Sequence, residues 1–187
     1  DNTFLGQRRD PEIKEIKSKL QLDDIDCIYS SPMLRTIQTA EIISKKKEII
    51  IDKRLKEIDY GLAEGLDYDE LHHGFPYIIE GWKSKKDMSF PDGENTEDVL
   101  VRLKSFLKFL KKDLNANNKK KIGIVTHNVI LRCLIGTYYK INLNDWHKLI
   151  IPHGIIFEFK FKNNYFYPNL DRRLLQSIMK NIVFRVI

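Results

Sequence analysis

Apolar and polar positions along the chain predict strands and helices in alternation. Short apolar runs of strand length occupy residues 25–29, 48–51, 121–126 and 154–161. Apolar residues at helical spacing occupy residues 11–20, 32–44, 96–114 and 128–139. This order of elements favours a three-layer α/β/α sandwich with a mixed, mostly parallel sheet and helices on both faces.

Residues 54–92 interrupt this alternation. Glycine and proline punctuate the stretch, and short helical pieces are predicted between them. Six aromatic residues argue against a linker: Tyr60, Tyr68, Phe75, Tyr77, Trp82 and Phe90. We therefore predict an irregular insertion that folds over a sheet edge and carries substrate specificity. Neither a repeat nor a second domain is indicated, so residues 1–187 are predicted to form one domain.

The charge of the chain favours anionic partners, because its formal net charge is +6. Its lysines are scattered or stand in short runs such as 45–47 and 119–121, which is typical of solvated faces. We therefore favour solvated faces over a nucleic-acid-binding surface, and we expect no nucleic-acid partner. No apolar stretch approaches the ~20 residues that a membrane helix needs, so no membrane partner is expected either.

The two cysteines do not suggest a disulfide. Cys27 falls in a predicted strand and Cys133 in a predicted apolar helix, which favours core thiols of a reducing compartment. No secretory pattern opens the chain, so a cytoplasmic protein is expected. Its oligomeric state cannot be read from the pattern.

Two polar turns that follow predicted strands hold the candidate chemistry. Arg35 comes shortly after the strand at 25–29, and His127 comes directly after the strand at 121–126. A parallel sheet gathers its strand ends along one edge, where helix N-termini present N–H groups to anions. An arginine and a histidine at this edge would suit a phosphate.

Four segments, in order, resemble the histidine phosphatases of the phosphoglycerate mutase-like superfamily. Residues 30–40 read SSPMLRTIQTA and are similar to the second signature of that family. Residues 55–65, LKEIDYGLAEG, resemble its acid-bearing segment, and residues 124–132, IVTHNVILR, resemble its last signature. PDGEN at 91–95 stands where many members have a Gly-Glu-Ser turn.

The resemblance implies a role for each site residue. Arg35 and His127 would hold the phosphoryl oxygens, and the N–H of Asn128 at a helix N-terminus would add a donor. Glu57 would give a proton to the leaving oxygen and later activate water, although Asp59 and Glu64 compete for this role. A protonated His127 would supply a further donor to the developing charge. No metal or other cofactor is implied.

The activity that the resemblance implies is hydrolysis of a small phosphorylated metabolite through a phosphohistidine. Phosphatase is favoured over mutase because the Glu57 segment ends Ala-Glu-Gly, as in phosphatase members. Phosphoglycerate mutase-type phosphoryl transfer is the alternative. His72 and His73 follow a helical fragment rather than a strand, and we predict that they lie on the surface. His153 stays a weaker pocket candidate.

The nucleophile signature of the family, Arg-His-Gly, does not occur in the 187 residues. Asn2 lies in a segment that resembles the loop after that signature, and residues 179–187 resemble the strand before it. Asn2 and Arg185 are therefore expected to join the phosphate ligands.

Two explanations of the missing signature are open. Either the chain is permuted, with residues 179–187 filling the slot of the first strand, or a segment before Asp1 supplies that strand. We favour the first, because loss of an interior strand would expose two ladders of unpaired backbone groups. Without the histidine, the chain is expected to be a non-catalytic phosphate-binding module.

Overall fold

Strand β1 (Cys27–Ser30) lies in the middle of a three-stranded parallel sheet, between β2 (Glu48–Ile51) and β3 (Ile122–Val125). The computed structural model describes residues 25–117, 119, 121–152, 155–163 and 165–181. All of β1 is buried, as the middle strand of a covered sheet should be. Ser30 pairs with both Ile51 and Val125, so the three strands end at the same level.

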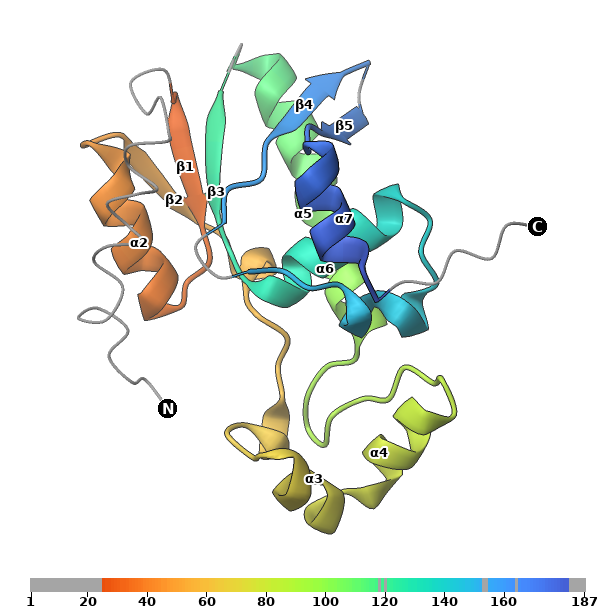
Figure 1. Cartoon of the computed structure of the whole chain (residues 1–187). Coiled ribbons are helices and arrows are strands. Elements are labelled where there is room, and N and C mark those ends of the chain that lie inside the picture. The colour runs from red at the N-terminus through yellow and green to blue at the C-terminus, as the bar shows by residue number, and fades with distance from the viewer. Residues whose placement is uncertain (1–24, 118, 120, 153–154, 164, 182–187) are drawn as a thin grey trace. The chain divides into compact units, whose positions relative to one another are not determined.

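Helices cover both faces of this sheet (Figure 1). Successive side chains of a strand point to opposite faces. Ile28 therefore packs against Ala40 and Ile43 of α2 (Leu34–Ser44). The ring of Tyr29 meets Phe106 and Phe109 of α5 (Thr96–Ala116), with ring centroids 5.6 and 6.0 Å apart. The predicted α/β fold with a parallel sheet between helices is confirmed.

The chain divides into two compact units, each assembled from two stretches. Residues 1–57 and 101–130 form one unit, which holds the parallel sheet, and residues 58–100 and 131–187 form the other. Helix α6 (Asn128–Tyr138) begins in the first and continues into the second. The single domain expected over residues 1–187 stays a prediction.

The second unit contains short helices and a hairpin. Its remaining elements are the 3-10 turns Gly61–Ala63 and Leu143–Lys148, helices α3 (Tyr68–Gly74), α4 (Pro76–Lys83) and α7 (Arg172–Met179), and strands β4 (Phe159–Lys162) and β5 (Tyr165–Pro168). Strands β4 and β5 pair antiparallel. A capping box of Asp67 and Glu70 starts α3, and Pro76 opens α4.

The predicted insertion at 54–92 consists of short helical pieces, as expected. Ala63, Leu71, Ile78 and Ile79 are buried together and give this region a small apolar core of its own. It is therefore a folded part of the protein rather than a linker. Its role in specificity stays a prediction.

Several predicted boundaries move. The first strand begins at Cys27 rather than at residue 25, and α2 begins at Leu34, two residues after Pro32. The strand predicted over 154–161 is wrong in extent: β4 begins at Phe159, because only this part pairs with β5. Neither β5 nor α7 is predicted by the sequence pattern.

Other predictions fall outside the described residues. These are the helix at 11–20, the loop that contains Asn2, His153, and the apolar run at 182–187. Met179, at the start of the predicted first-strand segment, is the last residue of α7 and is buried.

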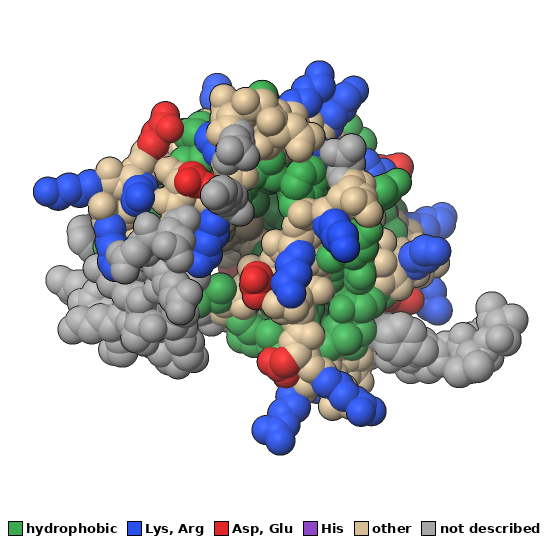
Figure 2. All heavy atoms as spheres, turned by 90° about the horizontal axis from the view of Figure 1, so that it is seen from above, with side chains coloured by type: hydrophobic (Ala, Val, Ile, Leu, Met, Phe, Trp, Pro, Cys, Tyr) green, Lys and Arg blue, Asp and Glu red, His purple; other side chains and the backbone are tan. Residues whose placement is uncertain are grey.

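The face of the molecule drawn in Figure 2 carries side chains of mixed type. Figure 2 shows lysine and arginine side chains spread over one face among apolar and other polar groups. Among the helices of the described residues, none has the length and apolarity needed to cross a bilayer.

We predict that the hydrogen bond between Tyr29 and α5 contributes measurably to the free energy of unfolding. The Tyr29 hydroxyl donates to Asp113 Oδ2 over 2.7 Å, and burial together with this carboxylate raises the pKa of Tyr29 to about 12. Tyr29→Phe keeps the buried ring and removes the hydrogen bond. We expect a loss of about 2 kcal/mol in the free energy of unfolding by urea denaturation.

Tyr167→Phe is the matched control, because Tyr167 is 40% exposed on β5. It should change the stability by less than about 0.5 kcal/mol. Equal stability of Tyr29→Phe and the wild type would show that the hydroxyl contact does not hold α5 to the sheet.

Candidate active site

Arg35 and His127 meet at the carboxyl edge of the parallel sheet. Arg35 is the second residue of α2, which follows β1, and His127 lies between β3 and α6. Arg35 Nη2 is 3.2 Å from His127 Nδ1, and Ser31 Oγ is 2.8 Å from His127 Nε2. Arg35 and Ser31 precede His127 by 92 and 96 positions in the sequence. The fold brings all three into one hydrogen-bonded group.

The hydrogen bonds of His127 fix its tautomer. A guanidinium only donates, so Nδ1 accepts from Arg35 through its lone pair. The ring proton therefore lies on Nε2 and is donated to Ser31 Oγ. His127 is a neutral imidazole in this arrangement.

The electrostatics of the site agree with a neutral His127. Its side chain is buried, and burial together with the positive charges of Arg35 and Arg102 lowers the pKa of His127 to about 3. The extra donor that a protonated His127 would supply is therefore not present in the ligand-free protein. The cause is physical: an imidazolium here would be a buried cation beside a guanidinium.

The Glu57 carboxylate contacts the first turn of α6, the helix that follows His127. Its Oε1 accepts the backbone N–H of Val129, the second residue of α6, over 3.2 Å. Thr126 Oγ1 donates to the Leu55 carbonyl oxygen over 2.9 Å, which ties the end of β3 to the chain before Glu57. The structure therefore brings Glu57 to the edge where Arg35 and His127 meet.

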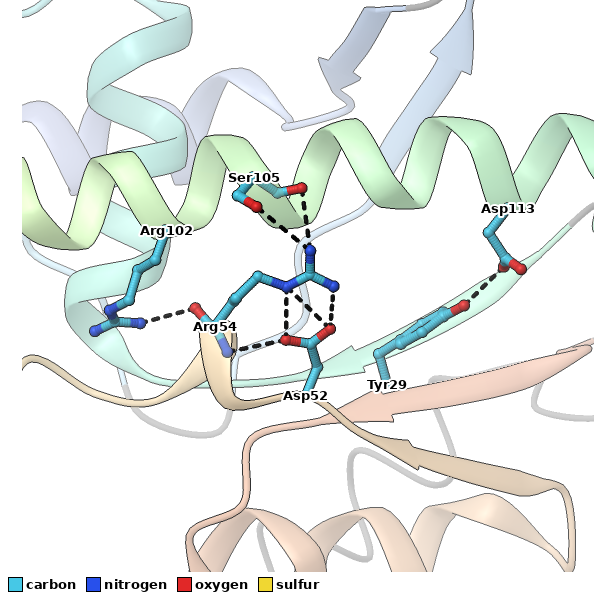
Figure 3. Close-up of polar contacts among 6 residues, drawn as sticks. All are labelled: Tyr29, Asp52, Arg54, Arg102, Ser105 and Asp113. Carbon is cyan, nitrogen blue, oxygen red and sulfur yellow. Dashed lines mark hydrogen bonds and ion pairs between the residues drawn. The ribbon is translucent and has the colours of Figure 1, made fainter.

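Arg102 of α5 holds the backbone that carries Glu57, although the sequence pattern does not single it out (Figure 3). Its Nη1 donates to the carbonyl oxygens of Arg54 and Lys56 over 2.8 and 2.7 Å, and its Nη2 to that of Glu57 over 3.1 Å. The one signal in the sequence is an arginine next to the apolar stripe of this helix. Three carbonyls on one guanidinium fix the course of the turn.

A second arginine braces the same turn from within. Arg54 Nε donates to Asp52 Oδ1 over 2.9 Å (Figure 3). Its guanidinium carbon lies 4.8 Å from the centre of the Phe109 ring. Although burial acts to raise it, the hydrogen bonds and charge of Arg54 hold the pKa of Asp52 below its usual value. The stretch Asp52 to Glu57 is thus a fixed support for the Glu57 carboxylate.

Comparison with known proteins identifies the family of the chain. The family model of the histidine phosphatase superfamily (branch 1) matches residues 11–170. The chain belongs to this superfamily. The predicted histidine phosphatase resemblance is therefore confirmed at the level of the family.

Two curated relatives are named phosphatases. A phosphoserine phosphatase 1 of Hydrogenobacter thermophilus is 29% identical over 145 residues, which span 76% of this chain and 67% of the relative. A fructose-2,6-bisphosphatase of Saccharomyces cerevisiae is 27% identical over 146 residues, spanning 77% of this chain and 30% of the relative. This histidine phosphatase chain thus spans less than a third of the yeast protein.

Solved structures show the same fold. An alpha-ribazole phosphatase of Shigella flexneri superposes with a TM-score of 0.74 at 16% identity, covering 86% of this chain and 79% of that one. A phosphoserine phosphatase mutant of Entamoeba histolytica, in complex with phosphoserine, gives a TM-score of 0.67 at 24% identity with the same coverage.

The other predicted site residues have separate places. Asn128 is the first residue of α6, where its N–H belongs to the helix N-terminus as expected. Asp59 Oδ1 accepts the N–H of Gly61 over 3.0 Å, a local turn contact, and Glu64 is exposed. Asn2 and Arg185 lie outside the described residues.

The remaining titratable side chains have simpler roles. His72 and His73 are exposed on α3, as expected. Cys27 and Cys133 are buried free thiols, also as expected. Within the described part of the chain, no group of three or more His, Cys, Asp or Glu side chains is arranged to hold a metal ion.

Replacement of Arg102 by lysine should loosen the support of Glu57. A single ammonium cannot serve three carbonyls in the geometry of the guanidinium fork. We expect Arg102→Lys to lose about 2 kcal/mol of stability, with faster amide hydrogen exchange at the turn between Asp52 and Glu57. Lys104→Gln, on an exposed position of the same helix, is the control. Unchanged exchange in Arg102→Lys would contradict the positioning role.

Proposed function

We propose that this chain forms the catalytic site of a phosphomonoester hydrolase that acts through a phosphohistidine on a small phosphorylated metabolite. The observation that carries the proposal is the meeting of Arg35 and His127 at a helix N-terminus, with the Glu57 carboxylate on the same helix start. Family membership supports the same chemistry.

Phosphate binding follows from the charges at this edge. Arg35 offers a permanent charge and a planar pair of donors, and the first N–H groups of α6 add partial positive charge. The neutral His127 has its Nδ1 beside Arg35. An arriving phosphate dianion screens the arginine, raises the pKa of His127 and turns this side chain into a second donor.

Proton transfer is the role we assign to Glu57. A carboxylic acid here protonates the leaving oxygen as the P–O bond breaks and the phosphoryl group bonds to the nucleophilic histidine of the family's Arg-His-Gly signature. The carboxylate then takes a proton from the water that attacks phosphorus, and the P–N bond to that histidine breaks. The backbone of Glu57 is held by Arg102, so the carboxylate stays in place through both steps. No metal is required by this scheme, because Arg35, His127 and the helix N-terminus neutralise the charge.

The class of substrate is supported by the relatives. A bacterial relative is named for phosphoserine, and one structural neighbour holds phosphoserine. A small phosphorylated amino acid is therefore the first ester to test. Alpha-ribazole phosphate and fructose 2,6-bisphosphate follow, since other relatives are named for them.

A second candidate function rests on one observation. The signature Arg-His-Gly does not occur in the 187 residues, and a site that these residues formed by themselves would bind a phosphoester without turning it over. Such a phosphate-binding module needs Arg35 and His127 but not Glu57. The two candidates therefore differ in whether a nucleophilic histidine takes part and in the role of Glu57.

The deciding experiment measures phosphate affinity by calorimetry and turnover of an aryl phosphate and phosphoserine in parallel. Arg35→Gln should weaken phosphate binding about tenfold or more. Glu57→Gln should leave that affinity within about threefold and lower turnover about 100-fold or more. Arg173→Gln, an exposed arginine of α7, is the control and should change neither.

Each outcome separates the candidates. Turnover that depends on Glu57 supports the hydrolase, and phosphate binding without turnover supports the module. Phosphate affinity that does not depend on Arg35 would contradict both. The proposed phosphate contacts of Asn2 and Arg185 are tested in the same assay by Asn2→Ala and Arg185→Gln.

A further inference from the structure

A cavity in the 58–100 region is walled by aromatic rings. It encloses about 360 Å³, and the rings of Tyr60, Tyr68, Trp82 and Phe90 line it. Small-ligand pockets begin at about this size. Trp82 is 41% exposed and Tyr68 is 57% exposed, so a ligand can reach part of both side chains.

The rings stand at steep angles to one another rather than in a stack. Tyr60 lies at 73° to Phe90 with ring centroids 4.8 Å apart, and Trp82 lies at 71° to Phe90 with centroids 6.0 Å apart. Steeply crossed rings form the walls of a box, whereas stacked rings would close over each other. The faces of such rings are electron-rich, so a ring face that borders the cavity attracts a cation.

A carboxylate completes the lining. Asp67 borders the cavity, and its Oδ1 accepts the N–H of Glu70 at the start of α3. The capping box holds this residue by two hydrogen bonds, because the Asp67 backbone N–H also donates to the Glu70 carboxylate. A fixed negative charge at an aromatic box is the complement of a cation and repels phosphate.

We propose that this aromatic box binds an organic cation of the alkylated ammonium class. A methylated ammonium is attracted to the π-faces of aromatic rings. It is weakly hydrated, so its entry into an apolar cavity costs little, and the negative charge of Asp67 attracts it further. An anionic or neutral polar ligand lacks these gains. The overall charge of +6 makes a cation site on this chain unexpected from composition alone.

The test uses choline as probe and the fluorescence of Trp82 as readout. The other tryptophan, Trp146, is only 4% exposed and contributes a constant background. All titrations are made at one fixed pH, and sodium chloride holds the ionic strength constant. The control ligand is 3,3-dimethylbutan-1-ol, which has carbon in place of the charged nitrogen.

We expect saturable quenching by choline with half-saturation at about 1 mM or below, and at least about tenfold weaker binding of the neutral alcohol. Asp67→Asn should weaken choline binding about tenfold, because asparagine keeps the helix cap and removes only the charge. Asp69→Asn is its control: this residue carries the same charge in the first turn of α3 and does not border the cavity.

A second pair of variants tests the rings. Tyr68→Leu removes an exposed wall of the box and should weaken choline binding several-fold, whereas Tyr77→Leu, an exposed tyrosine of α4 outside the cavity, should not. Equal binding of choline and the neutral alcohol would overturn the proposal in favour of a merely apolar pocket. Unchanged affinity in Asp67→Asn, or no saturable quenching, would overturn it as well.

Discussion

The parallel pairing of β1 with β2 and β3 is the constraint on which the site depends. Because Ser30 pairs with both Ile51 and Val125, the chain leaves all three strands at one level. The backbone continues this register for one more step: Ser31 N donates to the Val125 carbonyl over 3.0 Å and Asp52 N to that of Ser30 over 2.9 Å. A slip of register would separate Ser31 from His127 and the Asp52 turn from both.

The positive charges at this edge of the sheet favour the binding of an anion. Arg35 and Arg102 act on a buried His127, which remains neutral because a third cation there would be unpaired. The hydrogen bonds of Arg102 to three carbonyls satisfy one guanidinium with backbone dipoles. In the proposed function, phosphate supplies the negative charge that these groups lack, and its binding is coupled to protonation of His127.

The layered fold and the pairing of Arg35 with His127 were predictable from sequence, because both depend on short-range patterns. Strand-length apolar runs and helix signals at 30–40 and 124–132 place these residues at one sheet edge. The tautomer and the neutral state of His127 were not, since they depend on which groups bury it. The role of Arg102 could not be predicted, because its partners are backbone carbonyls 45 to 48 positions away, which leave no side-chain pattern in the sequence. The bounds of the β4–β5 hairpin could not be predicted, because strand pairing rather than apolarity sets its ends.

The most direct test of the phosphate site is the titration of the His127 ring nitrogens by nuclear magnetic resonance, with and without inorganic phosphate. The account predicts a neutral Nε2–H ring with a pKa of about 3 in the free protein, and a pKa raised by saturating phosphate. The exposed His72 and His73 serve as internal references. A free-protein pKa near the ordinary histidine value, or a His127 signal that ignores phosphate, would contradict it.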